Sequence, residues 1–156
     1  AMLARDVDRL EALQAEIPDA IGIPCEVTDV GALERAIARV DPPKVVVHNA
    51  VGGAFGSFRD IDPAVLQRNF EINTTALLHL ARLTTPAMVS AGEGALIITG
   101  NTSALRGKAA FAGFAPTKAA QRILAESLAR ELGPKGVHGA ISSSTQSSTC
   151  RGSARG

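Results

Sequence analysis

The sequence contains no tryptophan and no tyrosine, and its aromatic residues are five phenylalanines. With so few aromatic side chains in 156 residues, alanine, leucine, valine and isoleucine must fill the hydrophobic core. The missing tyrosine also excludes a phenol as a proton donor or acceptor in any reaction that this chain performs.

Strong charge and long apolar runs are lacking as well. A formal net charge of +1 gives no reason to expect nucleic acid or an anionic membrane as a partner. No apolar run approaches the ~20 residues that span a bilayer, and the first residues lack the pattern of a secretory signal. Cys25 and Cys150 do not suggest a disulfide framework, and the three histidines lack metal-ligand spacing. We therefore expect a cytoplasmic protein without a metal site.

The most informative stretch runs from residue 94 to residue 136. It opens with an apolar run over 95–99, which is bounded by glycines and is typical of a buried parallel strand. A hydroxyl-rich loop follows, and apolar residues at helical spacing then predict a helix over 116–132. Gly133 is expected to end this helix in the left-handed conformation, with Pro134 preventing its continuation.

The preceding part of the chain alternates between predicted helices and predicted strands. The helices are expected at 5–16, 29–40 and 63–91, and the strands at 20–27 and 44–48. Asp62 followed by Pro63 is a strong start signal for the longest helix. This alternation predicts an α/β fold with a parallel sheet.

An aromatic residue precedes a lysine by four positions in the sequence Phe114-Ala115-Pro116-Thr117-Lys118. A strand, a hydroxyl-rich loop and an aromatic-x-x-x-Lys motif at a helix start resemble the short-chain dehydrogenase/reductase family, and the resemblance covers about residues 3–139. The family motif is Tyr-x-x-x-Lys, in which the tyrosine is the general acid/base. Because phenylalanine has no titratable group, the chain resembles a variant branch of the family.

The resemblance also implies which residues form the site. The lysine would bind the nicotinamide ribose, and Asn73 would hold a water molecule near it. The serine that orients the substrate carbonyl in the family would fall on Asn101 or Thr102, with Ser103 beside them. The implied catalytic residues are Lys118, Asn73, Thr102, Ser103 and Phe114, and the implied cofactor-binding residues are Arg5, Glu26, Val27, Asn49, Ala50, Gly52 and Lys118.

Each assignment has a structural alternative that the sequence leaves open. Lys118 could be a solvated lysine at a helix start, and Thr102 and Ser103 could cap the loop. Arg5 could be a solvated residue of an amphipathic helix rather than a ligand of a 2′-phosphate. If it does bind that phosphate, the cofactor NAD(P) would be NADP, which we slightly favour over NAD.

The fold that the resemblance implies is a Rossmann-like, doubly wound parallel sheet with helices on both faces. No Gly-x-x-x-Gly-x-Gly turn precedes Arg5, and the family's first strand belongs at the centre of the sheet. Without it, the strands at 20–27 and 44–48 would not be neighbours. We therefore expect an incomplete Rossmann-like domain over 1–141, which is a fragment of a longer protein or is completed by a partner.

The composition changes after residue 141. Seven of the eight residues from Ser142 to Thr149 are serine or threonine, a composition that cannot build a hydrophobic core. We expect residues 142–156 to form a disordered Ser/Thr-rich tail.

Two functions from different classes follow. The first is an NAD(P)-dependent oxidoreductase that transfers a hydride to or from a small carbonyl or alcohol, with weak or absent activity because the phenol is missing. Water, Thr102 or Ser103 would then replace the phenol. The second is a non-catalytic nucleotide-binding or structural subunit, or a truncated inactive product. In either case the helices at 63–91 and 116–132, with small residues such as Ala125 and Ala129, resemble the family's interface for a homodimer or homotetramer.

Overall fold

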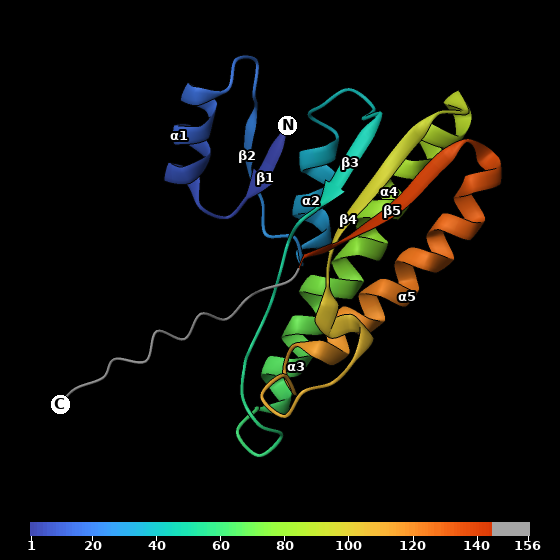
Figure 1. The fold of residues 1–156 in the computed structure, drawn as a ribbon. Helices are drawn as coiled ribbons and strands as arrows, with labels where there is room; N and C mark the ends of the chain where they lie inside the picture. The colour runs from blue at the N-terminus through green and yellow to red at the C-terminus, as the bar shows by residue number, and fades with distance from the viewer. Residues whose placement is uncertain (145–156) are drawn as a thin grey trace.

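The computed structural model describes residues 1–144, and the side chains of residues 1–142. Five strands and five α-helices alternate along this part of the chain (Figure 1). In order, they are β1 (Met2–Ala4), α1 (Val7–Glu16), β2 (Gly22–Pro24), α2 (Val30–Ile37), β3 (Val45–His48), α3 (Pro63–Phe70), α4 (Ala76–Ala91), β4 (Gly94–Asn101), α5 (Ala115–Leu132) and β5 (Val137–Ser144).

All strand pairs are parallel, and they form two separate sheets. β1 pairs with β2, and β3, β4 and β5 form a three-stranded sheet in that order. β2 and β3 are therefore not paired with each other, as we expected for this topology. The order matches a doubly wound sheet that is interrupted between β1 and β3. The α/β prediction is confirmed.

Helices pack on both faces of the β1–β2 pair. A Cβ on Gly22 would lie 3.0 Å from the Cβ of Leu10, so this face of β2 contacts α1. The next residue, Ile23, faces the other way and belongs to the core that includes Leu33 of α2. α1 and α2 accordingly lie on opposite sides of this pair (Figure 1).

The larger sheet has its core on one face. Val46 of β3 and Leu96 and Ile98 of β4 are buried with Leu77 of α4 and Ala125 of α5. The other face of β3 is open, since Val45 and Val47 are 56% and 57% exposed. The structure therefore has its central hydrophobic layer between this sheet and α2, α4 and α5.

The long helix predicted from Pro63 to residue 91 is present but contains one wide turn. Asp62 caps its start by accepting a hydrogen bond from the backbone N–H of Ala64. The π-helical turn Glu71–Thr75 joins α3 to α4 without a break. Such turns insert one extra residue and occur often at functional positions. Asn73 lies in this turn and is fully buried.

The ends of α4 and α5 that lie far from this turn contact each other closely. α4 ends at Gly92, and α5 is followed by a 3₁₀ turn, Gly133–Lys135, and then Gly136. A Cβ on Gly136 would lie only 2.0 Å from the carbonyl oxygen of Gly92. The expectation that Gly133 takes the left-handed conformation is wrong: its φ is −51°, and Gly136 takes the positive φ of 82°. The reason is that the helical coil tightens through Pro134 before the chain turns.

The boundary expected after residue 141 also differs from the structure. Ser142, Ser143 and Ser144 continue β5 and pair with Thr99, Gly100 and Asn101. Backbone hydrogen bonding to β4 extends the strand even though serine adds no apolar surface. The remainder of the expected tail, residues 145–156, lies outside the described residues.

Candidate functional site

A lysine at the start of α5 lies beside the carboxyl ends of β3 and β4. Lys118 is 3% exposed, and its ammonium group donates hydrogen bonds to the Thr99 carbonyl oxygen at 3.1 Å and to Gln121 Oε1 at 2.9 Å. Two of its three N–H donors are therefore used. Burial lowers the pKa of Lys118 to about 8. An amine of this kind can exchange a proton near neutral pH.

The lysine lines a pocket of about 200 Å³. The other lining residues come from the loop after β3, the end of β4 and the residue before α5, and they are Asn49, Val51, Thr99, Gly100, Asn101 and Phe114. In open α/β sheets, ligands bind at this edge, outside the carboxyl ends of the strands. Of the expected site residues, the structure thus brings together Asn49, Phe114 and Lys118.

Phe114 belongs to a cluster of three phenylalanines. Its ring centroid lies 5.3 Å from that of Phe55 and 6.5 Å from that of Phe111, and Phe55 and Phe111 are 5.2 Å apart in an edge-to-face arrangement. The Lys118 ammonium is 5.9 Å from the Phe114 centroid, which is within the range of a cation–π contact. Phe114 therefore supplies an apolar, negatively polarised ring face to the lysine, with no proton to transfer.

Asn73 is placed behind this pocket and does not line it. Its Oδ1 accepts from the Gly52 N–H at 2.9 Å, and its Nδ2 donates to the Gly52 carbonyl oxygen at 2.7 Å and to Thr117 Oγ1 at 2.8 Å. Both N–H donors of the amide are used in this way. Asn73 thus joins the loop after β3 to α5, and Gly52 takes part through its backbone. Ala50 is half-buried in the same loop.

The two hydroxyl residues expected in the site are not in the lysine pocket. Thr102 is exposed, and Ser103 lines a second pocket. Asn101 lines the lysine pocket instead, where it is 8% exposed and its Oδ1 accepts from the Ser103 N–H at 2.8 Å. The spacing of 13 residues between Asn101 and Phe114 indicated Asn101 as a site residue. The expectation of a hydroxyl group at this site favoured the neighbouring Thr102 and Ser103 instead.

The residues expected near the adenine end form a separate charged cluster. Arg5 follows β1, and its guanidinium lies 3.5 Å from the Glu26 carboxylate, which also pairs with Arg68 at 3.2 Å. Partial burial of Glu26 raises its pKa, but hydrogen bonds from Thr28 and the two guanidinium groups outweigh it, and the pKa is lowered. Val27 is half-buried in this loop. Arg5 is thus already paired with a carboxylate.

One buried histidine was not expected in the site region. His48 ends β3, is 2% exposed and has no hydrogen-bond partner for Nε2 within residues 1–142. Burial, with a smaller effect of the Lys118 charge, lowers its pKa to about 4. It is therefore neutral at neutral pH, and its ring contacts the backbone of Ile72 and Asn73 in the π-helical turn.

Over residues 1–144, no group of three or more His, Cys, Asp or Glu residues is arranged to hold a metal ion. Within the same range, none of the helices combines the length and the hydropathy that a membrane span requires.

Comparison with known proteins gives a consistent result. Chicken D-erythrulose reductase is 28% identical over 133 residues, which cover 85% of this chain and 54% of the reductase. Pig carbonyl reductase [NADPH] 2 is 29% identical over 128 residues, covering 80% and 52% of the two chains. The crystal structure of a short-chain dehydrogenase from Sphingobium yanoikuyae in complex with NADPH superposes with a TM-score of 0.82 at 27% identity, covering 92% of this chain and 61% of that one.

The chain thus spans about half the length of the curated relatives it matches. The sequence profile of the short chain dehydrogenase family matches residues 1–145. This match includes every described strand and helix and both sides of the lysine pocket. The chain belongs to the short-chain dehydrogenase family.

Proposed function

We propose that this chain forms the carbonyl-binding half of an NAD(P)-dependent oxidoreductase that acts on a small carbonyl or alcohol. The observation that carries the proposal is the pocket that places Lys118 beside Asn101, Asn49 and Phe114 at the carboxyl ends of β3 and β4. Relatives named as reductases and the NADPH complex of a similar structure support the same reaction class.

The residues present fit the nicotinamide and ribose end of the cofactor. One N–H of Lys118 remains after its bonds to Thr99 and Gln121, and it can bind either a ribose hydroxyl or the carbonyl oxygen of the substrate, one at a time. The Asn49 side chain lies in the same pocket wall. A bound nicotinamide cofactor supplies the hydride. Arg5 would have to break its ion pair with Glu26 to bind a 2′-phosphate. The slight preference for NADP therefore requires that the phosphate replace the Glu26 carboxylate as the partner of Arg5.

Lys118 is our candidate for the proton donor that replaces the phenol. With a pKa of about 8, its ammonium form predominates at neutral pH and can release a proton to a carbonyl oxygen as negative charge develops there. The Asn101 amide can donate a hydrogen bond to the same oxygen and polarise the carbonyl. This assignment replaces Thr102 and Ser103 because neither lines the pocket. Asn73 acts as a positioning residue.

The test is calorimetric binding of NADPH and NADH to the 156-residue chain and to Lys118→Ala, followed by assay of carbonyl reduction. Loss of a charged hydrogen-bond donor is expected to weaken nucleotide binding at least about tenfold. Lys135→Ala is the matched control, since Lys135 is an exposed lysine that pairs with Glu131 near the far end of α5. If both variants bind and react like the wild type, the oxidoreductase proposal fails.

A second candidate function is a non-catalytic subunit that dimerises through α4 and α5. Leu78 on α4 and Ile123 on α5 are 39% and 51% exposed and would be covered by a partner helix pair. Ala125 and Ala129 do not contribute to such an interface, because Ala125 is in the core and Ala129 packs against Gly139. Sedimentation at micromolar concentrations would show the dimer.

The free, buried Cys25 thiol supports our proposed location in the reducing cytoplasm.

A further inference from the structure

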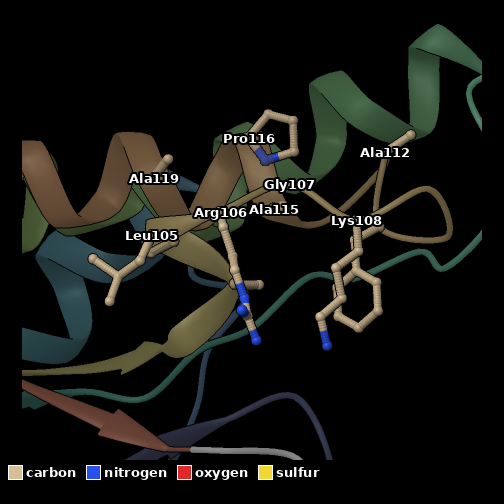
Figure 2. Close-up of a pocket in the computed structure, with 11 residues that line it drawn as sticks. Leu105, Arg106, Gly107, Lys108, Ala112, Ala115, Pro116 and Ala119 are labelled. Carbon is tan, nitrogen blue, oxygen red and sulfur yellow. The ribbon is translucent and has the colours of Figure 1, made fainter.

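A second and larger pocket, of about 370 Å³, is lined in part by Phe111, whose ring centroid lies 6.5 Å from that of Phe114 in the lysine pocket. It lies between the turn Thr102–Leu105, the loop that follows it and the first turns of α5 (Figure 2). Its wall includes Ser103, which is two residues from Asn101, and Phe111, whose ring contacts those of Phe55 and Phe114. Each pocket is therefore lined by one ring of the phenylalanine cluster, Phe111 in the second pocket and Phe114 in the lysine pocket.

The charge of this pocket is entirely positive. Among the described residues, Arg106 and Lys108 are its only charged lining residues, and no aspartate or glutamate of residues 1–142 lines its wall. Neither cation forms a salt bridge within residues 1–142. The two side chains extend from the loop in the same direction, away from Pro116 and Ala119 (Figure 2). The Lys108 ammonium lies 5.3 Å from the Phe111 ring centroid, so this cation is held next to the apolar cluster.

A buried polar atom in the same wall also lacks a partner. Ser103 is 7% exposed, and its hydroxyl forms no hydrogen bond within residues 1–142. A buried hydroxyl without a partner is costly, and such a group in a pocket wall is commonly satisfied by a ligand. A hydroxyl can donate to an anionic oxygen, as can the guanidinium and the ammonium groups.

The phenylalanine cluster indicates what the rest of the ligand is like. Phe55 is 58% exposed although its ring contacts Phe111 edge-to-face and Phe114 at a tilt, so it adds apolar surface next to one lining ring of each pocket. Aromatic rings bind such surfaces in offset or edge-to-face arrangements. A ligand that reaches from Asn101 and Lys118 to the two cations would cross this surface.

We propose that the substrate is an aromatic or similarly apolar carbonyl compound that carries an anionic oxygen group, a carboxylate or a phosphate ester, seated at Ser103, Arg106 and Lys108. The carbonyl lies in the lysine pocket, the apolar body on Phe55 and Phe111, and the anion in the second pocket. The placement of the carbonyl in the lysine pocket rests on the proposed function. Binding of the anionic group in the second pocket does not depend on that function.

The experiment measures binding of three probes by calorimetry, without nucleotide, at low and high salt. The probes are 4-acetylbenzoate, 4-acetylphenyl phosphate and the neutral 4-acetylbenzamide. We expect at least one anionic probe to bind more tightly than the amide, with an affinity that falls as salt rises. The stronger of the two anions identifies the natural group.

Arg106→Gln combined with Lys108→Gln should weaken binding of the anionic probe about tenfold and leave the amide unchanged. Ser103→Ala should weaken binding of the anionic probe severalfold. The control is Arg39→Gln combined with Arg130→Gln, which removes the same net charge from exposed positions outside both pockets. Equal binding of amide and anions, or an equal effect of both double variants, would overturn the anion site. Failure of nucleotide binding or turnover with a preserved anion site would instead count against the proposed oxidoreductase function.

Discussion

The ammonium nitrogen of Lys118 lies 5.9 Å from the centre of the Phe114 ring, so the lysine faces an apolar ring at the position where a phenol would carry the proton. The ring is 4% exposed and is fixed by contacts with Phe55 and Phe111. The ring of residue 114 is therefore held in a fixed position near the lysine.

Phe114→Tyr should raise the rate of carbonyl reduction. A phenol beside the Lys118 ammonium can donate a proton to the carbonyl oxygen, and general acid catalysis contributes about 10²–10⁴ in rate. The measurement is kcat/KM with NADPH and an aryl ketone. Phe58→Tyr is the matched control, because it adds the same hydroxyl to an exposed ring that lines neither pocket. An equal gain in both variants would argue against a specific role of position 114.

The pH dependence of any reduction should follow Lys118. Its pKa is lowered to about 8, so the protonated form that donates to the carbonyl predominates below that value and disappears above it. We expect kcat/KM for reduction to be constant from about pH 6.5 to 7.5 and to fall tenfold per unit well above pH 8. In Phe114→Tyr the pH at which kcat/KM begins to fall should change, since a second group then supplies the proton. A profile that stays flat to pH 10 in the wild type would exclude Lys118 as the donor.

His48 should make the fold sensitive to acid. Burial lowers its pKa from 6.5 to about 4, so between these values the unfolded chain binds a proton that the folded chain does not. The free energy of unfolding is therefore highest above pH 6.5. It falls as the pH decreases towards 4, by about 3 kcal/mol in total. Urea unfolding of the wild type and of His48→Asn at pH 7, 5.5 and 4.5 measures the effect. The variant should lose less stability over this range.

Asn73→Ala should destabilise the protein by roughly 2–3 kcal/mol. The substitution removes three hydrogen bonds and leaves the Gly52 backbone groups and the Thr117 hydroxyl buried without that partner. Urea denaturation measures the change. Asn49→Ala provides the comparison, because Asn49 is exposed and its loss should change stability by less than about 0.5 kcal/mol. Similar stability of the two variants would show that the Asn73 contacts are not structural.

Gly52→Ala should also be destabilising, for a steric reason. The added Cβ would lie 2.7 Å from Asn69 Oδ1 and 3.0 Å from the Cδ1 of Ile72, and it would push on the helix that carries Asn73. Overpacking of this kind costs about 1–3 kcal/mol. Gly107→Ala, where no atom lies within 4 Å of the new Cβ, should be close to neutral in the same urea unfolding experiment.

The sequence predicted elements with strong local signals more successfully than it predicted side-chain placement. The cap at Asp62, the buried strand after Gly94 and the helix that carries Lys118 follow from local patterns, and all three are present. Gly133 was misassigned because the choice of left-handed residue depends on how close Gly136 comes to Gly92, a contact between distant segments. Local patterns carry no information about such contacts.

Site residues show the same division. Lys118 was found because its motif fixes both its helix and its facing direction. The sequence favoured Thr102 and Ser103 over Asn101, and it could not show that Asn101 and Ser103 line different pockets on either side of the start of the turn Thr102–Leu105. Asn73 was expected to hold water, whereas its amide is already bonded to Gly52 and Thr117. The assignments of the site residues themselves remain predictions.

The close approach of Gly136 to Gly92 has a mechanical consequence for the opposite end of the molecule. Because no side chain fits between Gly136 and Gly92, the turns that follow α4 and α5 lie in direct backbone contact, which restricts sideways movement of these two helix ends. The displacement of a lever grows with distance from its pivot, and α5 begins at Ala115, next to Phe114 and close to Lys118. A rotation of the two helices about this contact would therefore displace Lys118 and the linings of the two pockets more than the glycine turns.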